Sequence, residues 1–300
     1  TGQNNSVIGY QAAYTNTTGA SNAVLGHSAL YSNTIGTNNV AIGRQALYTN
    51  TEGDEQVAVG RQALYLNTTG TSNTAVGWAS LSNNTTADNN TAVGYQAAKG
   101  NTTGSYNTAL GREALEANTT ANYGTAVGYQ AMRGSSASGQ TGDGVNVAIG
   151  YSAMQAVTTA TNNIAIGGNA LDAYTSGDGN VAIGRDALGA AANAEDRNIA
   201  IGRSAMSNTN NADSDHNVAI GSSTLQSGTV AAGANIAIGH QSMTDVDAVG
   251  SQHNTSIGYQ SMNGTWANTV SQYNVAIGSK TMQGVMDDAD DNTRSEEHTS

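Results

Sequence analysis

The stretch Asn39-Val40-Ala41-Ile42-Gly43-Arg44-Gln45-Ala46-Leu47 decides the fold of this 300-residue chain, because close variants of it recur from one end to the other. Its central glycine occurs sixteen times, at first every 17 residues and later every 17 to 20, with one step of 22. A fixed period of this size is typical of stacked repeats, in which each unit packs mainly on its neighbours. The glycines are Gly9, Gly26, Gly43, Gly60, Gly77, Gly94, Gly111, Gly128, Gly150, Gly167, Gly184, Gly202, Gly221, Gly239, Gly258 and Gly278.

The positions that stay fixed within the unit favour strands over helices. The place of Ile42 is always taken by Ile, Val or Leu, and the place of Leu47 by Leu or Met in fourteen units. Short β-branched segments that end at glycine favour strands, and no segment shows ten residues of helical periodicity. The sequence therefore predicts an all-β parallel β-solenoid of about 16 coils of 17–20 residues. Each coil should carry two short strands, one ending at Ile42 and one around Ala46 and Leu47.

Two of the fixed residues have expected backbone roles. Gly43 should form a corner that needs a positive φ angle or a close approach of two backbones. Asn39, which recurs in fourteen units, should form a ladder in which its amide bonds the amide of the next coil.

The expected interior of each coil is thin. Val40, Ile42 and Leu47 are the sizeable apolar residues of the unit, and Ala46 is small. Burying three such side chains at roughly 1.5–3 kcal/mol each barely offsets the ordering of 17 residues at about 1–2 kcal/mol each. We therefore expect a homo-oligomer of closed symmetry, in which the small Ala and Gly positions pack chain against chain.

Composition excludes several classes of protein. The chain has 37 glycines, no proline, cysteine or phenylalanine, and a net charge of −12. Without proline and a glycine at every third residue it is not a collagen, and without cysteine it has no disulfide framework or thiolate metal site. The negative charge argues against nucleic acid as a partner. No apolar run is long enough for a membrane helix, so we expect no membrane contact in this fragment.

Catalytic and metal-binding patterns are missing from the sequence. The five histidines are not spaced as a metal pair, and no nucleophile or paired-carboxylate arrangement stands out. We expect no enzyme activity, no catalytic residue, no cofactor and no bound metal. Acidic clusters could offer oxygen ligands to Ca²⁺, but they are better explained as solvated loop carboxylates. These clusters are Asp213 with Asp215, Asp245 with Asp247, and residues 287–291.

Stacking turns a repeated position into a column on the surface, and two such columns are candidates for ligand binding. Aromatic rings could stack on sugars, and arginines could hold anionic groups. The alternative is a self-stacking ladder that shields the coil edges or fills a seam between subunits. The candidate residues are Tyr14, Tyr31, Tyr48 and Tyr65 in one column, and Arg44, Arg61, Trp78 and Tyr95 in the other.

The Asn-x-Ala-Ile-Gly-x-x-Ala unit resembles the YadA-like head (Hep/Hag) repeats of trimeric autotransporter adhesins and related repeats of phage tail fibres. The resemblance covers about residues 4–283 and implies a left-handed β-roll in a homotrimeric rod. It implies a non-catalytic structural and adhesive segment of an extracellular fibre that binds a host or cell-surface glycan or protein receptor. The owner would be an outer-membrane-anchored fibre of a bacterial cell surface or, alternatively, the shaft or receptor-binding segment of a virion tail fibre. The family's usual repeat is shorter, so each coil here should carry an enlarged turn.

A remote alternative is an ice-binding β-solenoid, which the threonine-rich turns suggest. Such proteins need a regular Thr-x-Thr array on a flat strand face, and the sequence does not show one.

Five segments follow from the spacing. Residues 1–133 form regular 17-residue coils, 134–146 a loop insertion, and 147–286 longer and more apolar coils of the same solenoid. Residues 287–293 begin an interrupted next coil. Residues 294–300 resemble a translated sequencing adapter and are excluded from the fold prediction.

Overall fold

The fold is a parallel β-solenoid, as the sequence predicts. A computed structural model of the chain describes residues 2–134, 145–173, 175–189, 196–208, 214–226, 233–244, 251–264, 271–283 and 292–295. These residues contain seventeen three-residue strands and no helix. The chain divides into two compact units, Thr1–Asn146 and Val147–Ser300. The predicted insertion at 134–146 lies outside the described residues over 135–144. Residues 284–286 of the predicted longer coils, and residues 287–291 and 296–300 of the predicted terminal segments, also lie outside them.

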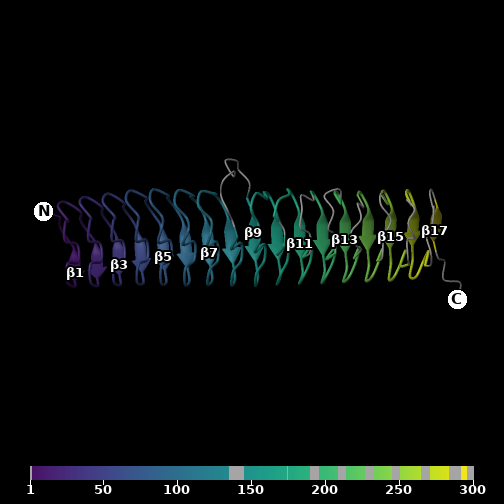
Figure 1. Cartoon of the computed structure of the whole chain (residues 1–300), viewed down its shortest axis with the longest axis horizontal. Helices are drawn as coiled ribbons and strands as arrows, with labels where there is room; N and C mark the ends of the chain where they lie inside the picture. The colour runs from purple at the N-terminus through teal and green to yellow at the C-terminus, as the bar shows by residue number, and fades with distance from the viewer. Residues whose placement is uncertain are drawn as a thin grey trace. The chain divides into compact units, whose positions relative to one another are not determined.

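In the first unit, one strand from each coil joins a parallel sheet in which equivalent residues pair (Figure 1). Val40 pairs with Val57, Ala41 with Ala58 and Ile42 with Val59. The strands are β1 (Ser6–Ile8), β2 (Ala23–Leu25), β3 (Val40–Ile42), β4 (Val57–Val59), β5 (Thr74–Val76), β6 (Thr91–Val93), β7 (Thr108–Leu110) and β8 (Thr125–Val127).

The second unit repeats this arrangement although its coils are longer. Ala182 pairs with Ala200 and Ala200 with Ala219, so the additional residues of these coils do not shift the register. The strands are β9 (Val147–Ile149), β10 (Ile164–Ile166), β11 (Val181–Ile183), β12 (Ile199–Ile201), β13 (Val218–Ile220), β14 (Ile236–Ile238), β15 (Thr255–Ile257), β16 (Val275–Ile277) and β17 (Thr293–Ser295).

The last strand includes residues that were excluded from the fold prediction. In β17, Arg294 pairs with Ala276 of β16, at the position where the repeat predicts alanine. All three residues of β17 are exposed.

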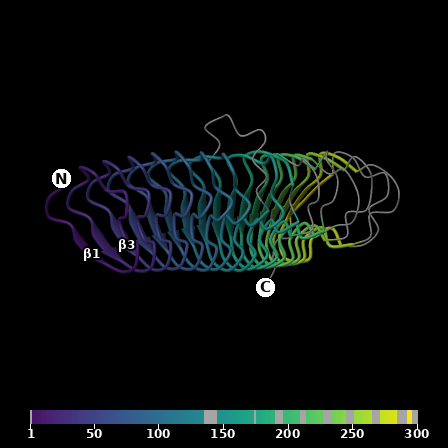
Figure 2. The same cartoon turned by 60° about the vertical axis from the view of Figure 1, so that its left-hand side comes forward.

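The prediction of a second strand around Ala46 and Leu47 was wrong. These residues lie in a turn, and Gln45 and Leu47 have left-handed backbone angles with φ of 58° and 51°. The turn still bonds both neighbouring coils, because Gln45 N donates to His27 O and Leu47 N donates to Ala63 O, each at 3.0 Å. Alternating left-handed residues therefore keep the hydrogen bonds between coils without extended backbone. Figure 2 shows the stacked turns of the first unit beside its strands.

The predicted core was only partly right. Ala41, Ala46 and Leu47 are fully buried, but Ile42 is 38% exposed and Val40 is half-buried. Side chains of a strand alternate between its two faces, so a three-residue strand sends only its middle residue inward. The middle residue is alanine in nearly every coil because Leu47 and its equivalents fill the remaining interior. The aliphatic residues that flank the alanine point outward.

The glycine corner is confirmed. Gly43 has a φ of 128°, and a Cβ placed on it would lie 2.5 Å from the carbonyl oxygen of Gly60. Both a left-handed backbone and a close approach therefore require glycine here.

Two buried asparagine columns join the coils of the first unit. In the column of Asn39, the side-chain oxygen of Asn22 accepts a bond from Asn39 N at 2.9 Å, and Asn39 Nδ2 donates to Gly53 O at 2.9 Å. In the column of Asn50, which the sequence did not single out, Asn50 Nδ2 donates to Asn33 Oδ1 and Gly53 O, both at 3.0 Å. The amide-to-amide ladder expected for Asn39 thus forms most regularly at the Asn50 position.

Gly184→Ala should lower the free energy of unfolding by at least about 2 kcal/mol, because it combines a φ of 136° with a Cβ only 2.5 Å from Gly202 O. Gly168→Ala is the matched control in the next coil toward the N-terminus, since its Cβ would meet no atom within 4 Å. Urea unfolding measures both variants, and equal stabilities would contradict the corner assignment.

Asn50→Ala should cost about 2–3 kcal/mol, because it removes both donors and also the acceptor that Asn67 Nδ2 uses at 2.8 Å. Asn83→Ala, at a half-buried turn position, should cost less than about 1 kcal/mol. Thermal unfolding followed by circular dichroism compares the two variants. A loss for Asn50→Ala no larger than the control would show that the ladder does not stabilise the coils.

Candidate functional site

Each unit exposes one face of its sheet, here named the strand face and made of the first and third residues of every strand. In the second unit this face is almost wholly aliphatic, with Thr255 as its one polar member from β9 to β16. More than a third of the surface of many of these side chains is exposed. These are Ile149, Ile164, Ile166, Ile199, Ile220, Ile236, Ile257 and Ile277.

The strand face of the first unit is more mixed. Threonine takes the first position of β5 to β8, at Thr74, Thr91, Thr108 and Thr125, beside aliphatic residues at the third. The residues that make the coils after Gly150 more apolar therefore lie on the exposed face and not in the interior, because the change from Thr to Val or Ile occurs at the first position of the strands.

The expectation of a packing face made of alanine and glycine was also wrong. Ala41 and Ala46 are buried inside the coil, and Gly43 packs against the next glycine corner. The strand face was missed because aliphatic residues were assigned to the core. The signal was present in the sequence, since alternation around a central alanine places both flanking residues on the other side.

The first candidate column is a continuous stack of tyrosine rings. Ring centroids lie 5.2 Å apart for Tyr14 and Tyr31, 5.1 Å for Tyr31 and Tyr48, and 5.3 Å for Tyr48 and Tyr65, with planes within 16° of parallel. Tyr14 is 64% exposed and the other three are half-buried. Each inner ring is covered on both faces by its neighbours, so the column presents edges and hydroxyl groups to a ligand. This geometry fits the self-stacking ladder better than a platform for sugar rings.

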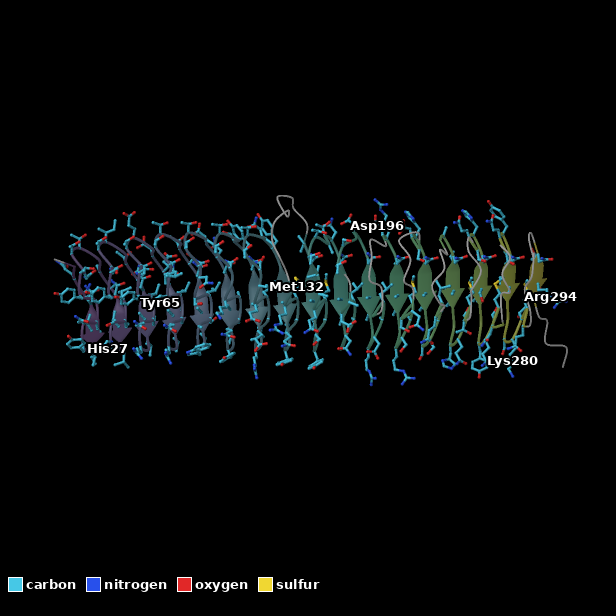
Figure 3. All side chains as sticks on the ribbon, in the orientation of Figure 1. His27, Tyr65, Met132, Asp196, Lys280 and Arg294 are labelled. Atoms are coloured by element: carbon cyan, nitrogen blue, oxygen red, sulfur yellow. The ribbon has the colours of Figure 1, made fainter. Side chains whose placement is uncertain are left out.

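The second candidate column, here named the corner column, contains the residues that directly follow the glycines of the first unit. Figure 3 labels one of them, His27, at the edge where the strands end. The column brings the four remaining candidates together in successive coils. Its members are Tyr10, His27, Arg44, Arg61, Trp78, Tyr95, Arg112 and Tyr129.

In the C-terminal half of the corner column, the side chains contact one another. Trp78 stacks on Tyr95 with centroids 4.9 Å apart, and the Arg112 guanidinium lies 5.2 Å from the Tyr95 ring and 5.7 Å from the Tyr129 ring. Arg112 Nε also pairs with Glu113 Oε1 at 3.0 Å. Arginine and aromatic rings thus satisfy one another in this part of the column.

The carboxylate of Glu113 contacts three polar side chains, those of Arg112, Gln130 and Arg133. Gln130 Nε2 donates to Glu113 Oε2 at 2.7 Å, and Arg133 Nε lies 3.6 Å from the same oxygen. The Gln130 hydrogen bond, with those of Arg112 and the charges of Arg112 and Arg133, holds the pKa of Glu113 below its usual value against the opposing effect of burial. The carboxylate therefore stays ionised and neutralises its arginine neighbours.

In the second unit, a column of carboxylates stands at the edge opposite the glycine corners, where Figure 3 labels Asp196. Asp178 N donates to Asp196 Oδ1 and Asp196 N to Asp215 Oδ1, both at 2.7 Å. A hydrogen bond from the Thr161 hydroxyl lowers the pKa of Asp178, with smaller effects of Asn162 and Arg197. These aspartates serve as acceptors between coils. Of the predicted acidic clusters, Asp213, Asp245, Asp247 and residues 287–291 lie outside the described residues.

Comparisons of the chain with family models, with curated proteins and with solved structures give no match in any of the three. In the part of the chain that the structure describes, no three His, Cys, Asp or Glu side chains gather as a metal site would need. The same part contains no helix of the length and apolarity needed to cross a membrane.

Replacing Tyr31 and Tyr48 by Ser should lower the free energy of unfolding by about 2–4 kcal/mol, because all three stacked contacts of the column are lost. Tyr14→Ser removes one contact and should cost roughly a third as much. Glycan binding per folded molecule, measured beside stability, should stay unchanged. Lost binding at unchanged stability would instead make the column a ligand surface.

Proposed function

We propose that this chain is a non-catalytic structural and adhesive segment of an extracellular fibre, in which copies associate side by side through their strand faces. The observation that carries the proposal is the row of outward aliphatic residues along the strands, clearest in Ile164, Ile166 and Ile199 of the second unit. Single exposed apolar residues are ordinary, but a continuous patch on a folded surface marks an interaction site.

The periodic form of the strand face favours another copy of the chain as its partner. Equivalent residues pair from coil to coil, as in Ala182 with Ala200, so the face repeats at the spacing of hydrogen-bonded strands, about 4.8 Å. A surface that matches this repeat at every coil is the same face of a second copy. Closed symmetry then covers every face, and the family resemblance favours three copies.

The same packing supplies burial that one coil lacks. The interior of a coil holds one Leu or Met and small alanines, as at Leu47, Ala41 and Ala46. If association covers two partly exposed aliphatic side chains per coil, the apolar area it buries is comparable with the area that the interior of the coil buries. The oligomer, on this proposal, stabilises the solenoid as well as the fibre.

The larger protein to which we propose that this segment belongs is a bacterial trimeric autotransporter adhesin, in whose head it would lie at the cell surface. The support is the resemblance of units such as Asn39-Val40-Ala41-Ile42-Gly43 to the YadA-like head repeat, together with the solenoid fold. A phage tail-fibre shaft or receptor-binding segment would use the same fold and the same strand face.

Ice binding is supported less well. Thr34 Oγ1 donates to Thr51 O at 2.9 Å and Thr51 Oγ1 to Thr68 O at 3.1 Å, so the turn hydroxyls bond the next coil. On the strand face of the described residues, threonine takes the first position of β5 to β8, β15 and β17 and never the third, so it forms no Thr-x-Thr array.

Sedimentation equilibrium of the full chain should give a trimer. Ile164→Asp with Ile199→Asp should give a monomer that unfolds at a lower temperature, because two charges enter the apolar contact and the burial between copies is lost. Ser222→Asp with Ser279→Asp adds the same charge away from the strand face and should leave the trimer intact. A stable, folded wild-type monomer would refute the proposal.

A further inference from the structure

The N-terminal half of the corner column contains two adjacent arginines in successive coils. Gln62 N donates to Arg44 O at 3.0 Å, and the strands before these corners pair in register, so the Arg44 and Arg61 backbones lie about 4.8 Å apart. Both side chains are exposed. Two positive charges are thus held next to each other on a chain whose net charge is −12.

Within the described residues these two arginines have no carboxylate partner, unlike Arg112 and Arg185 in equivalent positions. Within the described residues, the ion pairs are those of Arg112, Arg133 and Arg185. The cause is visible one residue further on, because Arg112 and Arg185 are followed by an acid that pairs with them.

Arg44 and Arg61 are instead followed by glutamines, and Gln62 Nε2 donates to Gln45 Oε1 at 3.4 Å. Because neither glutamine carries a charge, the guanidiniums repel each other without compensation. A bound anion would relieve that repulsion and accept hydrogen bonds from both side chains.

The next coil adds an aromatic surface to the arginine pair. Trp78 stacks on Tyr95 with one face, so its other face is turned toward the coil of Arg61. Among the described residues, the only guanidinium seated over rings is that of Arg112, on Tyr95 and Tyr129. The outer face of Trp78 is therefore not covered by a ring or by a guanidinium.

We propose that Arg44, Arg61 and Trp78 form a binding site for an acidic saccharide. Its carboxylate or sulfate group accepts hydrogen bonds from the two guanidiniums, and the apolar face of the adjoining pyranose ring packs on the open face of Trp78. The spacing of one coil between the arginines and the tryptophan is close to the length of one sugar unit. This site rests on the proposed adhesive function and gives its ligand a chemical class.

The test is calorimetric titration of the full chain at low salt with four probes. A heparin-derived hexasaccharide carries sulfates and carboxylates, an oligogalacturonate hexasaccharide carries carboxylates alone, maltohexaose is neutral, and inorganic sulfate lacks a sugar ring. At least one acidic hexasaccharide should bind, more weakly as salt is raised. Comparison of the two acidic probes identifies the anionic group, and maltohexaose should bind at least about tenfold more weakly.

Three variants locate the site. Arg44→Gln with Arg61→Gln should raise the dissociation constant of the acidic hexasaccharide about tenfold or more. Trp78→Leu should raise the dissociation constant of the hexasaccharide about threefold to tenfold without changing the binding of sulfate. Arg112→Gln is the matched control, because this arginine is already paired with Glu113. The affinity of this variant for the acidic hexasaccharide should stay within about twofold of the wild type.

Binding of neither acidic hexasaccharide would overturn the site, as would equal binding of maltohexaose. An Arg112→Gln loss as large as that of the double variant would do the same. Sedimentation of each variant keeps this result separate from the proposed fibre function, because Arg44, Arg61 and Trp78 lie outside the strand face. If the protein is a trimer but does not bind the acidic hexasaccharides, the proposed saccharide site alone is wrong. If the wild type is a monomer, the proposed fibre function is wrong.

Discussion

Hydrogen bonding between successive coils is the constraint on which the rest of the structure depends. Val40 N donates to Gln56 O in the next coil, and Gly43 N donates to Leu25 O in the previous one, each at 2.8 Å. Because the same bonds recur in coil after coil, each residue lies next to the equivalent residue of the neighbouring coil, at the spacing of hydrogen-bonded strands. Each position therefore needs a residue type that can pack beside another residue in the same place. The absence of proline follows, since it would remove a donor, and so does glycine at each corner, where a Cβ would strike the next backbone.

Stacking at this spacing also determines what the molecule can offer to partners. A coil closed by three-residue strands has room inside for alanine and one larger residue, as at Ala41 and Leu47, so Val40 and Ile42 remain outside. The same repetition aligns side chains into columns, in which like groups meet like. Tyrosines stack on tyrosines and asparagine amides bond one another, but Arg44 and Arg61 can only repel each other unless an anion lies between them.

Much of the fold could be predicted from the sequence because repetition exposes what each position requires. The period, the glycine corner and the bonding role of Asn39 were all readable from the chain. The turn at Gln45 and Leu47 was not, because neither residue type signals a left-handed backbone, and the coil-to-coil bonds impose that conformation. Ile42 was assigned to the core since it is aliphatic, although the two-residue alternation around Ala41 placed it outside. For the candidate site, the columns followed from the period alone. The covering of the inner tyrosine rings by their neighbours, and the single stacked partner of Trp78 among the described residues, depend on side-chain orientations that the period does not specify.

Hydrogen exchange of individual backbone amides is the measurement that tests the stacking constraint most directly. The account predicts strong protection at strand positions such as Val40. It predicts comparable protection at Leu47 and Thr49, whose amides donate to Ala63 O and Tyr65 O although they lie in a turn. Exchange at Leu47 and Thr49 as fast as in an unstructured peptide, beside a protected Val40, would contradict it. The coils would then be joined by their strands alone.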